Sequence, residues 1–227
     1  MAQKITKKDL TQPDAFQLAL ARFSDFVSEN KPKIYISSGV VLLIILLSAG
    51  LYLYKTNNEK NAQALYIKAH LATLNSRSAE SPADPNSMKL YQEVVTQYPG
   101  TNAALMSFYR LGNFYYQMND IEASIKAYQE YLKESPKDNE LTTLVYIGLG
   151  YCYESKKDLN KALEYFENAA KTKSSSNFES INYRNMARIH EELKNNEKSI
   201  EFYQKALEKT SEPAVEQLIK RKISSLS

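Results

Sequence analysis

Apolar and polar residues follow two different patterns along this chain, and the first is an unbroken apolar run. From Ile34 to Tyr54 the sequence holds 21 residues without a charge, most of them Leu, Ile and Val. A helix of that length reaches about 31 Å, close to the roughly 30 Å of a bilayer's hydrocarbon core. Tyr35 and Tyr52 stand near the two ends, where a ring suits the membrane–water interface. The pattern predicts a transmembrane helix over 34–54.

Two other structures would also produce an apolar run. A buried core helix is disfavoured, because few soluble helices are apolar on every face at this length. A cleavable signal peptide has an apolar region of about 7–15 residues behind a short basic start. Here 33 residues precede a longer run, which favours an uncleaved anchor. The small residues Ser48-Ala49-Gly50 leave processing open.

The tail before this run, residues 1–33, contains an amphipathic segment. Phe16, Leu20, Phe23 and Val27 are spaced to fall on one face of a helix. That face could lie on a membrane surface or on a partner helix, and loose packing near the anchor is an equal alternative. The tail holds six Lys/Arg and four Asp/Glu. This basic excess favours a cytoplasmic N-terminus, although lysines also follow the run.

After the apolar run, the apolar positions take up helical spacing and recur in three similar units. Each unit begins with an aromatic residue, a Leu-Gly pair or its equivalent, and a second ring. These positions are Phe108, Leu111, Gly112 and Tyr115; Tyr146, Leu149, Gly150 and Tyr153; and Tyr183, Met186, Ala187 and His190. A small residue and another ring follow at fixed distances: Ser124 and Tyr128; Ala162 and Phe166; and Ser199 and Tyr203. Repetition with this period predicts a solenoid of antiparallel helix pairs.

The repeats predict both boundaries and local contacts. Three full units occupy 105–213, a linker and a degenerate first unit occupy 55–104, and a capping helix occupies 214–227. Asp120, Asp158 and Asn195 stand where second helices should begin and can cap them. Gly112 and Gly150 should let the ring of the second helix approach closely.

The signature positions of each unit resemble the tetratricopeptide repeat. Departures are Ala187 in place of glycine and His190 in place of tyrosine. The resemblance implies an all-α fold in which a single transmembrane helix is followed by a tetratricopeptide-repeat solenoid of antiparallel helix pairs. It also implies that the protein binds other proteins.

The composition and the motifs of the chain argue against nucleic-acid binding and against catalysis. The net charge is +3, and residues 55–227 carry 23 basic and 22 acidic side chains, so they offer no electrostatic footprint for nucleic acid. The single cysteine, Cys152, and His190 fall at helical packing positions. No metal-ligand spacing, phosphate loop or nucleophile motif occurs. We expect no enzyme, no cofactor and no metal site.

The remaining candidate site is the inner groove that the first helices of stacked pairs should line. Its residues off the packing face are predicted to be Tyr109, Asn113, Tyr116, Ile147, Tyr151, Arg184 and Arg188. These positions lack the Lys and Asn clamp with which some repeat proteins hold a terminal carboxylate. An aromatic groove with one basic end suits an apolar extended segment. Packing of the tyrosines against one another is an equal alternative.

The order of segments and the last ten residues, Leu218 to Ser227, resemble the ancillary tetratricopeptide subunit of the bacterial Sec translocon. The resemblance implies a single-pass inner-membrane protein with a cytoplasmic N-terminus and periplasmic repeats. Its partners would be the Sec translocon, a membrane-anchored periplasmic chaperone, and nascent or unfolded chains, with no nucleic acid. The alternative is a single-pass receptor or assembly adaptor with its repeats in the cytosol.

Overall fold

The computed structural model describes residues 15–76, 84–135, 140–172 and 174–227, and all regular elements in these ranges are helical. The predicted all-α repeat fold is confirmed. The chain divides into two compact units, Met1–Thr56 and Asn57–Ser227. The first fourteen residues of the predicted tail lie outside the described residues.

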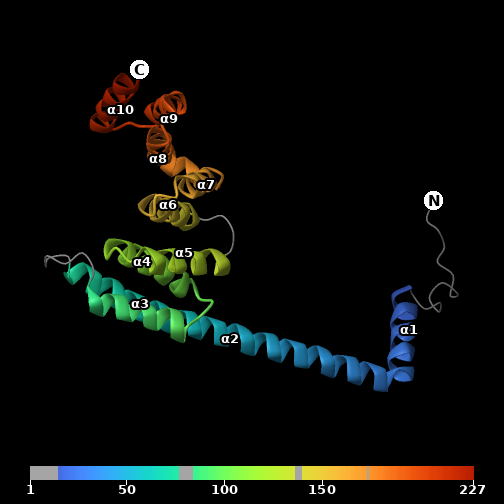
Figure 1. The fold of residues 1–227 in the computed structure, drawn as a ribbon. Helices are drawn as coiled ribbons and strands as arrows, with labels where there is room; N and C mark the ends of the chain where they lie inside the picture. Colours follow the sequence, from blue (N-terminus) through green and yellow to red (C-terminus); the bar gives the residue numbers. More distant parts are fainter. Residues whose placement is uncertain (1–14, 77–83, 136–139, 173) are drawn as a thin grey trace, which may run out of the picture. The chain divides into compact units, whose positions relative to one another are not determined.

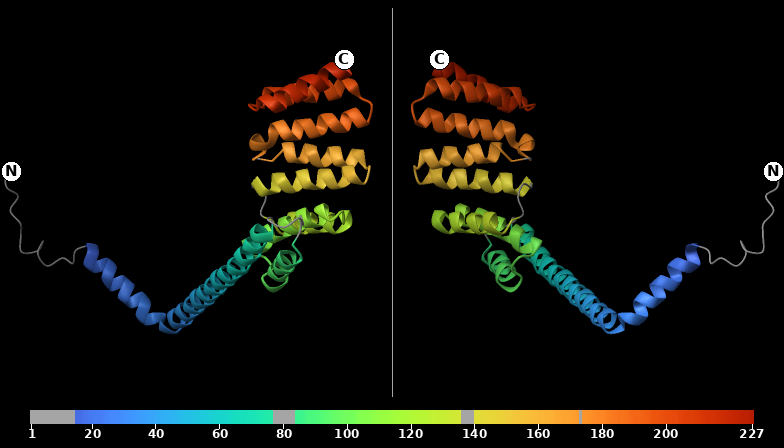
Figure 2. Two further views of the ribbon diagram at one scale, coloured as in Figure 1. Left: turned by 90° about the vertical axis from the view of Figure 1, so that its left-hand side faces the viewer. Right: turned by 90° about the vertical axis from the view of Figure 1, so that its right-hand side faces the viewer.

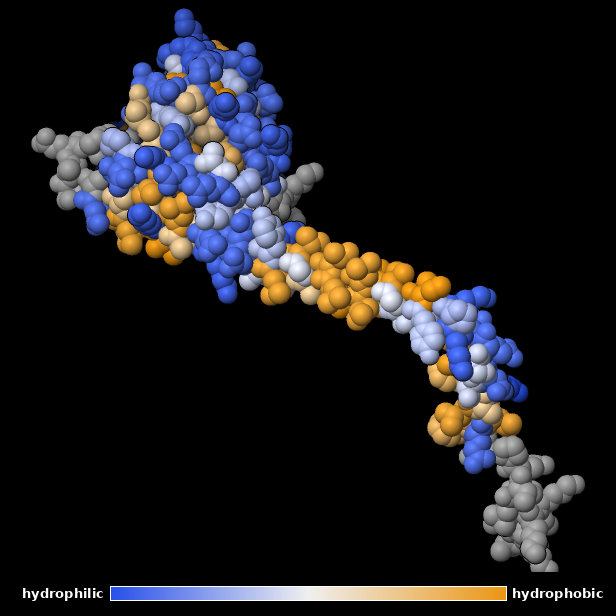
Figure 3. Space-filling view, turned by 90° about the horizontal axis from the view of Figure 1, so that it is seen from below, coloured by the Kyte–Doolittle hydropathy of each residue, from blue (hydrophilic) through white to orange (hydrophobic). Residues whose placement is uncertain are grey.

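The first unit contains helix α1, Ala15–Glu29, and the beginning of helix α2, Lys31–Ser76. The apolar face of α1 is exposed, with Phe16 71% and Phe23 67% accessible. In α2, an 18-residue window has a mean hydropathy of 2.4 and none of it is buried. Figure 3 shows this stretch as a continuous apolar surface. By length and composition alone, α2 can cross a membrane, and among the described residues it is the one helix that meets this criterion.

Helix α2 does not end at Tyr54, where the uncharged run ends. Residues 55–76 contain neither Gly nor Pro, so no residue there interrupts the helical hydrogen bonds. From Asn57 onward, α2 belongs to the second unit and acts as the first helix of the first pair. Its residues Ala62, Tyr66 and Ala69 are buried in the same cluster as Tyr91 and Val94 of α3.

The second unit is a stack of helix pairs, which Figures 1 and 2 show as successive layers along the repeats. After the end of α2, the elements are α3 (Pro85–Gln97), α4 (Asn102–Gln117), α5 (Ile121–Glu134), α6 (Glu140–Ser155), α7 (Leu159–Ala170), the 3-10 helix η1 (Ser175–Phe178), α8 (Glu179–Glu192), α9 (Asn196–Glu208) and α10 (Pro213–Leu226). The three predicted full units correspond to α4–α5, α6–α7 and α8–α9. Helix α10 packs on α9 and buries Ile219 against Tyr203 and Ala206.

The three predicted caps are confirmed. The side chains of Asp120, Asp158 and Asn195 accept hydrogen bonds from backbone N–H groups at the starts of α5, α7 and α9. The residue before each cap has a positive φ: 59° at Asn119, 62° at Lys157 and 58° at Lys194. This left-handed residue lets the chain reverse within one turn, because the N–H groups that follow bond back to the end of the first helix.

The predicted close approach at two glycines is also confirmed. A Cβ atom at Gly112 would lie 2.6 Å from Cδ1 of Tyr128, and one at Gly150 would lie 2.7 Å from Cδ1 of Phe166. Each ring therefore lies directly on the backbone of the first helix. This contact fixes how each second helix packs, and thereby which face of α4 and α6 is turned to the groove.

Candidate protein-binding groove

The first helices of the stack present their remaining faces to two adjoining cavities. The first, of about 280 Å³, is lined by α4 and α6 with Tyr128 and Phe178, and the second, of about 270 Å³, by α6, α8 and α10 with Tyr203. Tyr151 and Ile181 line both cavities, so the two form one groove. All seven residues predicted for the groove line it. Tyr109, Asn113, Tyr116 and Ile147 line the first cavity, Tyr151 lines both, and Arg184 and Arg188 line the second.

At the aromatic end of the groove, one tyrosine is buried in the helix packing and another is exposed on the surface. Tyr128 of α5 is 2% exposed and donates a hydrogen bond from its hydroxyl to Oδ1 of Asn113 at 2.7 Å. Burial raises the pKa of Tyr128, which keeps its hydroxyl neutral. Tyr116 is 36% exposed, and its ring lies 6.5 Å from that of Tyr151. Ile147 is 5% exposed and forms part of the floor.

At the basic end, most charges are paired across neighbouring helices. Arg188 of α8 donates two hydrogen bonds to the carboxylate of Glu154 on α6, at 2.7 and 2.6 Å, and lies 5.8 Å from the ring centre of Tyr151. Lys222 of α10 donates to Glu191 of α8 at 2.8 Å. These contacts tie α6, α8 and α10 together and hold the wall of the groove in place.

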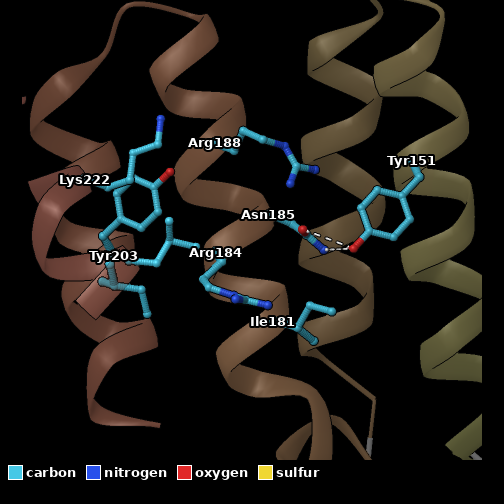
Figure 4. Close-up of a pocket in the computed structure, with 9 residues that line it drawn as sticks. Tyr151, Ile181, Arg184, Asn185, Arg188, Tyr203 and Lys222 are labelled. Carbon is cyan, nitrogen blue, oxygen red and sulfur yellow. Dashed lines mark hydrogen bonds between the residues drawn. The ribbon is translucent and has the colours of Figure 1, made fainter. Parts of the chain in front are cut away.

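Figure 4 shows how these side chains meet around the second cavity. Asn185 is 2% exposed and donates to the hydroxyl oxygen of Tyr151 at 3.0 Å, which fixes the ring between the two cavities. Arg184 and Arg188 extend on either side of this pair, with Arg184 toward Ile181. The groove therefore has a tyrosine at its centre and cationic groups at one end.

Several lining residues were not predicted from the sequence: Tyr128, Gly148, Ile181, Asn185, Leu218 and Lys222. A Cβ at Gly148 would lie 2.6 Å from Cζ of Tyr128, so this glycine admits the tyrosine from the neighbouring pair. Its position just before the Leu-Gly pair was a usable signal. Leu218 and Lys222 belong to α10, which lies outside the repeat pattern, so no repeat position pointed to them.

The residues considered for chemistry occupy structural positions. Cys152 is buried and lies 3.2 Å from Oγ of Ser124, and burial raises the pKa of the Cys152 thiol. His190 is buried, and its ring stacks on Phe202 at 5.4 Å. The predicted packing roles of Cys152 and His190 are thus confirmed. In the described ranges, no group of three or more His, Cys, Asp or Glu side chains could hold a metal ion.

This stack of helix pairs around an open groove defines a class of helical-repeat proteins. The family model of the tetratricopeptide repeat-like domain matches residues 25–227, and the chain belongs to this family. The fold generally serves as a scaffold for protein interactions. No curated protein matched the sequence.

Solved structures support the fold. A structure of MamA from Desulfovibrio magneticus RS-1, beginning at residue 41 of that protein, is 14% identical with a TM-score of 0.53, and the match covers 71% of this chain and 93% of that one. A double mutant of MamA RS-1 is 13% identical with a TM-score of 0.53, over 71% and 94% of the two chains. At these identities the likeness concerns the fold alone.

Proposed function

We propose that this protein is a membrane-anchored scaffold whose groove binds segments of other proteins. The observation that carries the proposal is the groove itself, with exposed tyrosine and isoleucine side chains and a basic end. The fully exposed apolar stretch of α2 supports an anchor, because nothing in the described residues covers it. The exposed apolar face of α1 would suit the adjoining membrane surface.

The finer proposal is that the scaffold assists newly translocated proteins at the Sec translocon of a bacterial inner membrane. The repeats would then face the periplasm, and the groove would recruit a chaperone or hold an emerging chain. Support comes from the order of tail, apolar helix, degenerate pair, full repeats and terminal helix, and from the sequence of the last ten residues. The basic excess of residues 1–33 supports a cytoplasmic N-terminus.

Crosslinking tests the binding groove. A photoreactive residue at Tyr116 or Tyr151 in the full-length, membrane-bound protein should yield adducts with protein partners. The matched control places the same residue at Lys126 of α5 or Glu164 of α7, which are exposed and line neither cavity. Adducts containing translocon or chaperone subunits, formed from the groove positions only, are expected. Equal adduct patterns from all four positions would refute a specific groove.

A topology experiment tests on which side of the membrane the repeats lie. A reporter active only in the periplasm, fused after Ser227, should work, and one active only in the cytoplasm should not. The opposite result would favour the second candidate, a receptor with cytosolic repeats, for which the lysines at 55 and 60 just after the apolar run are the favouring observation.

A further inference from the structure

The second cavity holds one more cationic than anionic group. Arg184, Arg188 and Lys222 line it, and the carboxylates of Glu154 and Glu191 pair with the last two. Arg184 has no ion pair or hydrogen bond of its side chain among the described residues. Its Nε atom is buried and has no hydrogen-bond partner there.

A buried N–H group without an acceptor is energetically unfavourable, and a bound acceptor that satisfies it removes this penalty. A guanidinium is planar and offers parallel donors that fit a carboxylate. Apolar side chains line the same cavity beside these polar groups. Ile181 is 36% exposed and Leu218 is 49% exposed. The site therefore matches a carboxylate that lies between apolar side chains.

The groove also continues past Arg184. The arginine lines a further cavity of about 320 Å³, formed by the start of α8 and by the loop between α9 and α10. That cavity is lined mainly by polar and charged residues, among them Ser176, Glu179, Lys209 and Glu212, and Glu179 pairs with Lys209 at 2.9 Å. A chain lying in the groove can thus extend beyond the arginine in both directions. This geometry fits a side-chain carboxylate within a segment better than the carboxylate at the end of one.

We propose that Arg184 selects client segments that carry an Asp or Glu flanked by apolar residues, with a further apolar side chain in the aromatic cavity. The proposal rests on the function proposed above. Neighbouring helices lie about 8–10 Å apart, and an extended chain advances about 3.3 Å per residue. Tyr116 on α4 and Arg184 on α8 are separated by two such intervals, with α6 between them, so the acidic residue and the apolar residue bound near Tyr116 are about five or six positions apart.

Binding of synthetic peptides to the full-length protein in detergent or nanodiscs tests this selection. The probes are nine-residue peptides, acetylated and amidated at their ends, that carry one Phe or Leu and one Asp or Glu at variable spacing. A second set replaces the acid by Asn or Gln. A third set has no acidic side chain but a free C-terminal carboxylate. The first set should bind at least tenfold more tightly than the second and third, with an optimum near a spacing of five or six residues.

Variants of the protein test whether Arg184 is the source of the preference for acidic peptides. Arg184→Gln should weaken binding of the acidic set about 10–100-fold and leave the amide set unchanged, because only the ionic contact is lost. The affinity of Arg184→Lys for the acidic set should lie between those of the wild type and Arg184→Gln, because lysine retains the charge but not the planar donors. Lys126→Gln removes the same charge from the outer face and should have no effect.

The outcomes separate the two proposals. Equal binding of acidic and amide peptides, or an acidic preference that survives Arg184→Gln, overturns the role of Arg184 and leaves the groove as a binding site. Preference for the free-carboxylate set overturns the internal carboxylate in favour of a chain end. Absence of binding by all three sets overturns the selection. The crosslinking from Tyr116 and Tyr151 then decides separately whether the groove has any protein partner.

Discussion

The α6–α7 and α8–α9 pairs occupy the same register of the repeat and are held together by different interactions. In α6–α7, the ring of Phe166 lies on Gly150 with no room for a Cβ atom. In α8–α9, the equivalent positions are Tyr203 and Ala187, and both are buried although a methyl group is present. The repeat register therefore does not require the glycine.

Polar contacts take a larger share in the α8–α9 pair. Ser199 donates to the carbonyl oxygen of Ala187 at 2.9 Å, and Tyr203 donates to Glu191 at 3.2 Å. The corresponding residues of α6–α7 are Ala162 and Phe166, which have no side-chain hydroxyl. One pair depends on close apolar packing and the other on packing plus hydrogen bonds. Substitutions in the two pairs should therefore lower the free energy of unfolding by different amounts.

Phe166→Ala should give the largest effect. The ring is fully buried, and its removal leaves a cavity that the helices cannot fill, so the free energy of unfolding should fall by about 3–5 kcal/mol. Denaturant unfolding followed by circular dichroism measures the change. Tyr165→Ala, on the same helix but half-buried, is the control and should cost less. Equal losses from both variants would show that the contact with Gly150 has no special weight.

Adding a methyl group to α6 and removing one from α8 tests whether the two helix pairs differ in how tightly they pack. Gly150→Ala places a Cβ against a rigid ring, so overpacking should outweigh the gain in helix propensity and leave a net loss of about 1–2 kcal/mol. Ala187→Gly should also lower stability, by about 1 kcal/mol, because it weakens the helix and relieves no clash. The same denaturation measurement checks both. A stabilised Gly150→Ala protein would contradict the packing described for α6–α7.

Much of the repeat region could be predicted because its signals are local. The caps at Asp120, Asp158 and Asn195 recur in all three units and the glycine under the ring in two of them, and both features depend on residues close in sequence. The same logic placed seven first-helix residues along one groove. Their role in binding stays a prediction.

Other features depend on contacts that no local pattern encodes. Lys222 reaches Glu191 from a helix outside the repeats, and Gly148 has a role only because Tyr128 of another pair lies against it. The unpaired state of Arg184 is visible only after every neighbouring carboxylate has been located. Nor did the end of the uncharged run mark the end of α2, because helix propensity continues through polar residues to Ser76.

Loss of a single buried hydroxyl should have a smaller effect than Phe166→Ala or Gly150→Ala. Ser199→Ala removes the hydrogen bond to the Ala187 carbonyl and should lower stability by about 0.5–1.5 kcal/mol. Ser124→Ala should behave alike, since its hydroxyl donates to the Gly112 carbonyl at 2.8 Å. The exposed Ser225→Ala is the control in the unfolding assay. If Ser199→Ala matched this control, hydrogen bonding would not distinguish α8–α9 from α6–α7.

The smallest expected effect is a pH dependence confined to the α8–α9 pair. His190 stands where the other two units have Tyr115 and Tyr153, and burial, aided by Lys198, lowers its pKa below the usual 6.5, against the opposing charges of Glu167 and Glu201. The folded state therefore binds this proton less readily than the unfolded chain. Between the lowered folded pKa and the unfolded value, stability should rise with pH, and it should be weakest on the acidic side.

Unfolding of wild-type protein and of His190→Tyr, measured at several values between pH 5 and pH 8, isolates this contribution. The other titratable groups are common to both proteins, so their contributions cancel in the difference. The wild type should lose stability relative to the variant as the pH falls through the window. A difference that does not change with pH would mean that His190 is protonated equally in both states. In that case stacking on Phe202 would not require the neutral ring, and the position would differ in charge from its tyrosine counterparts at acidic pH.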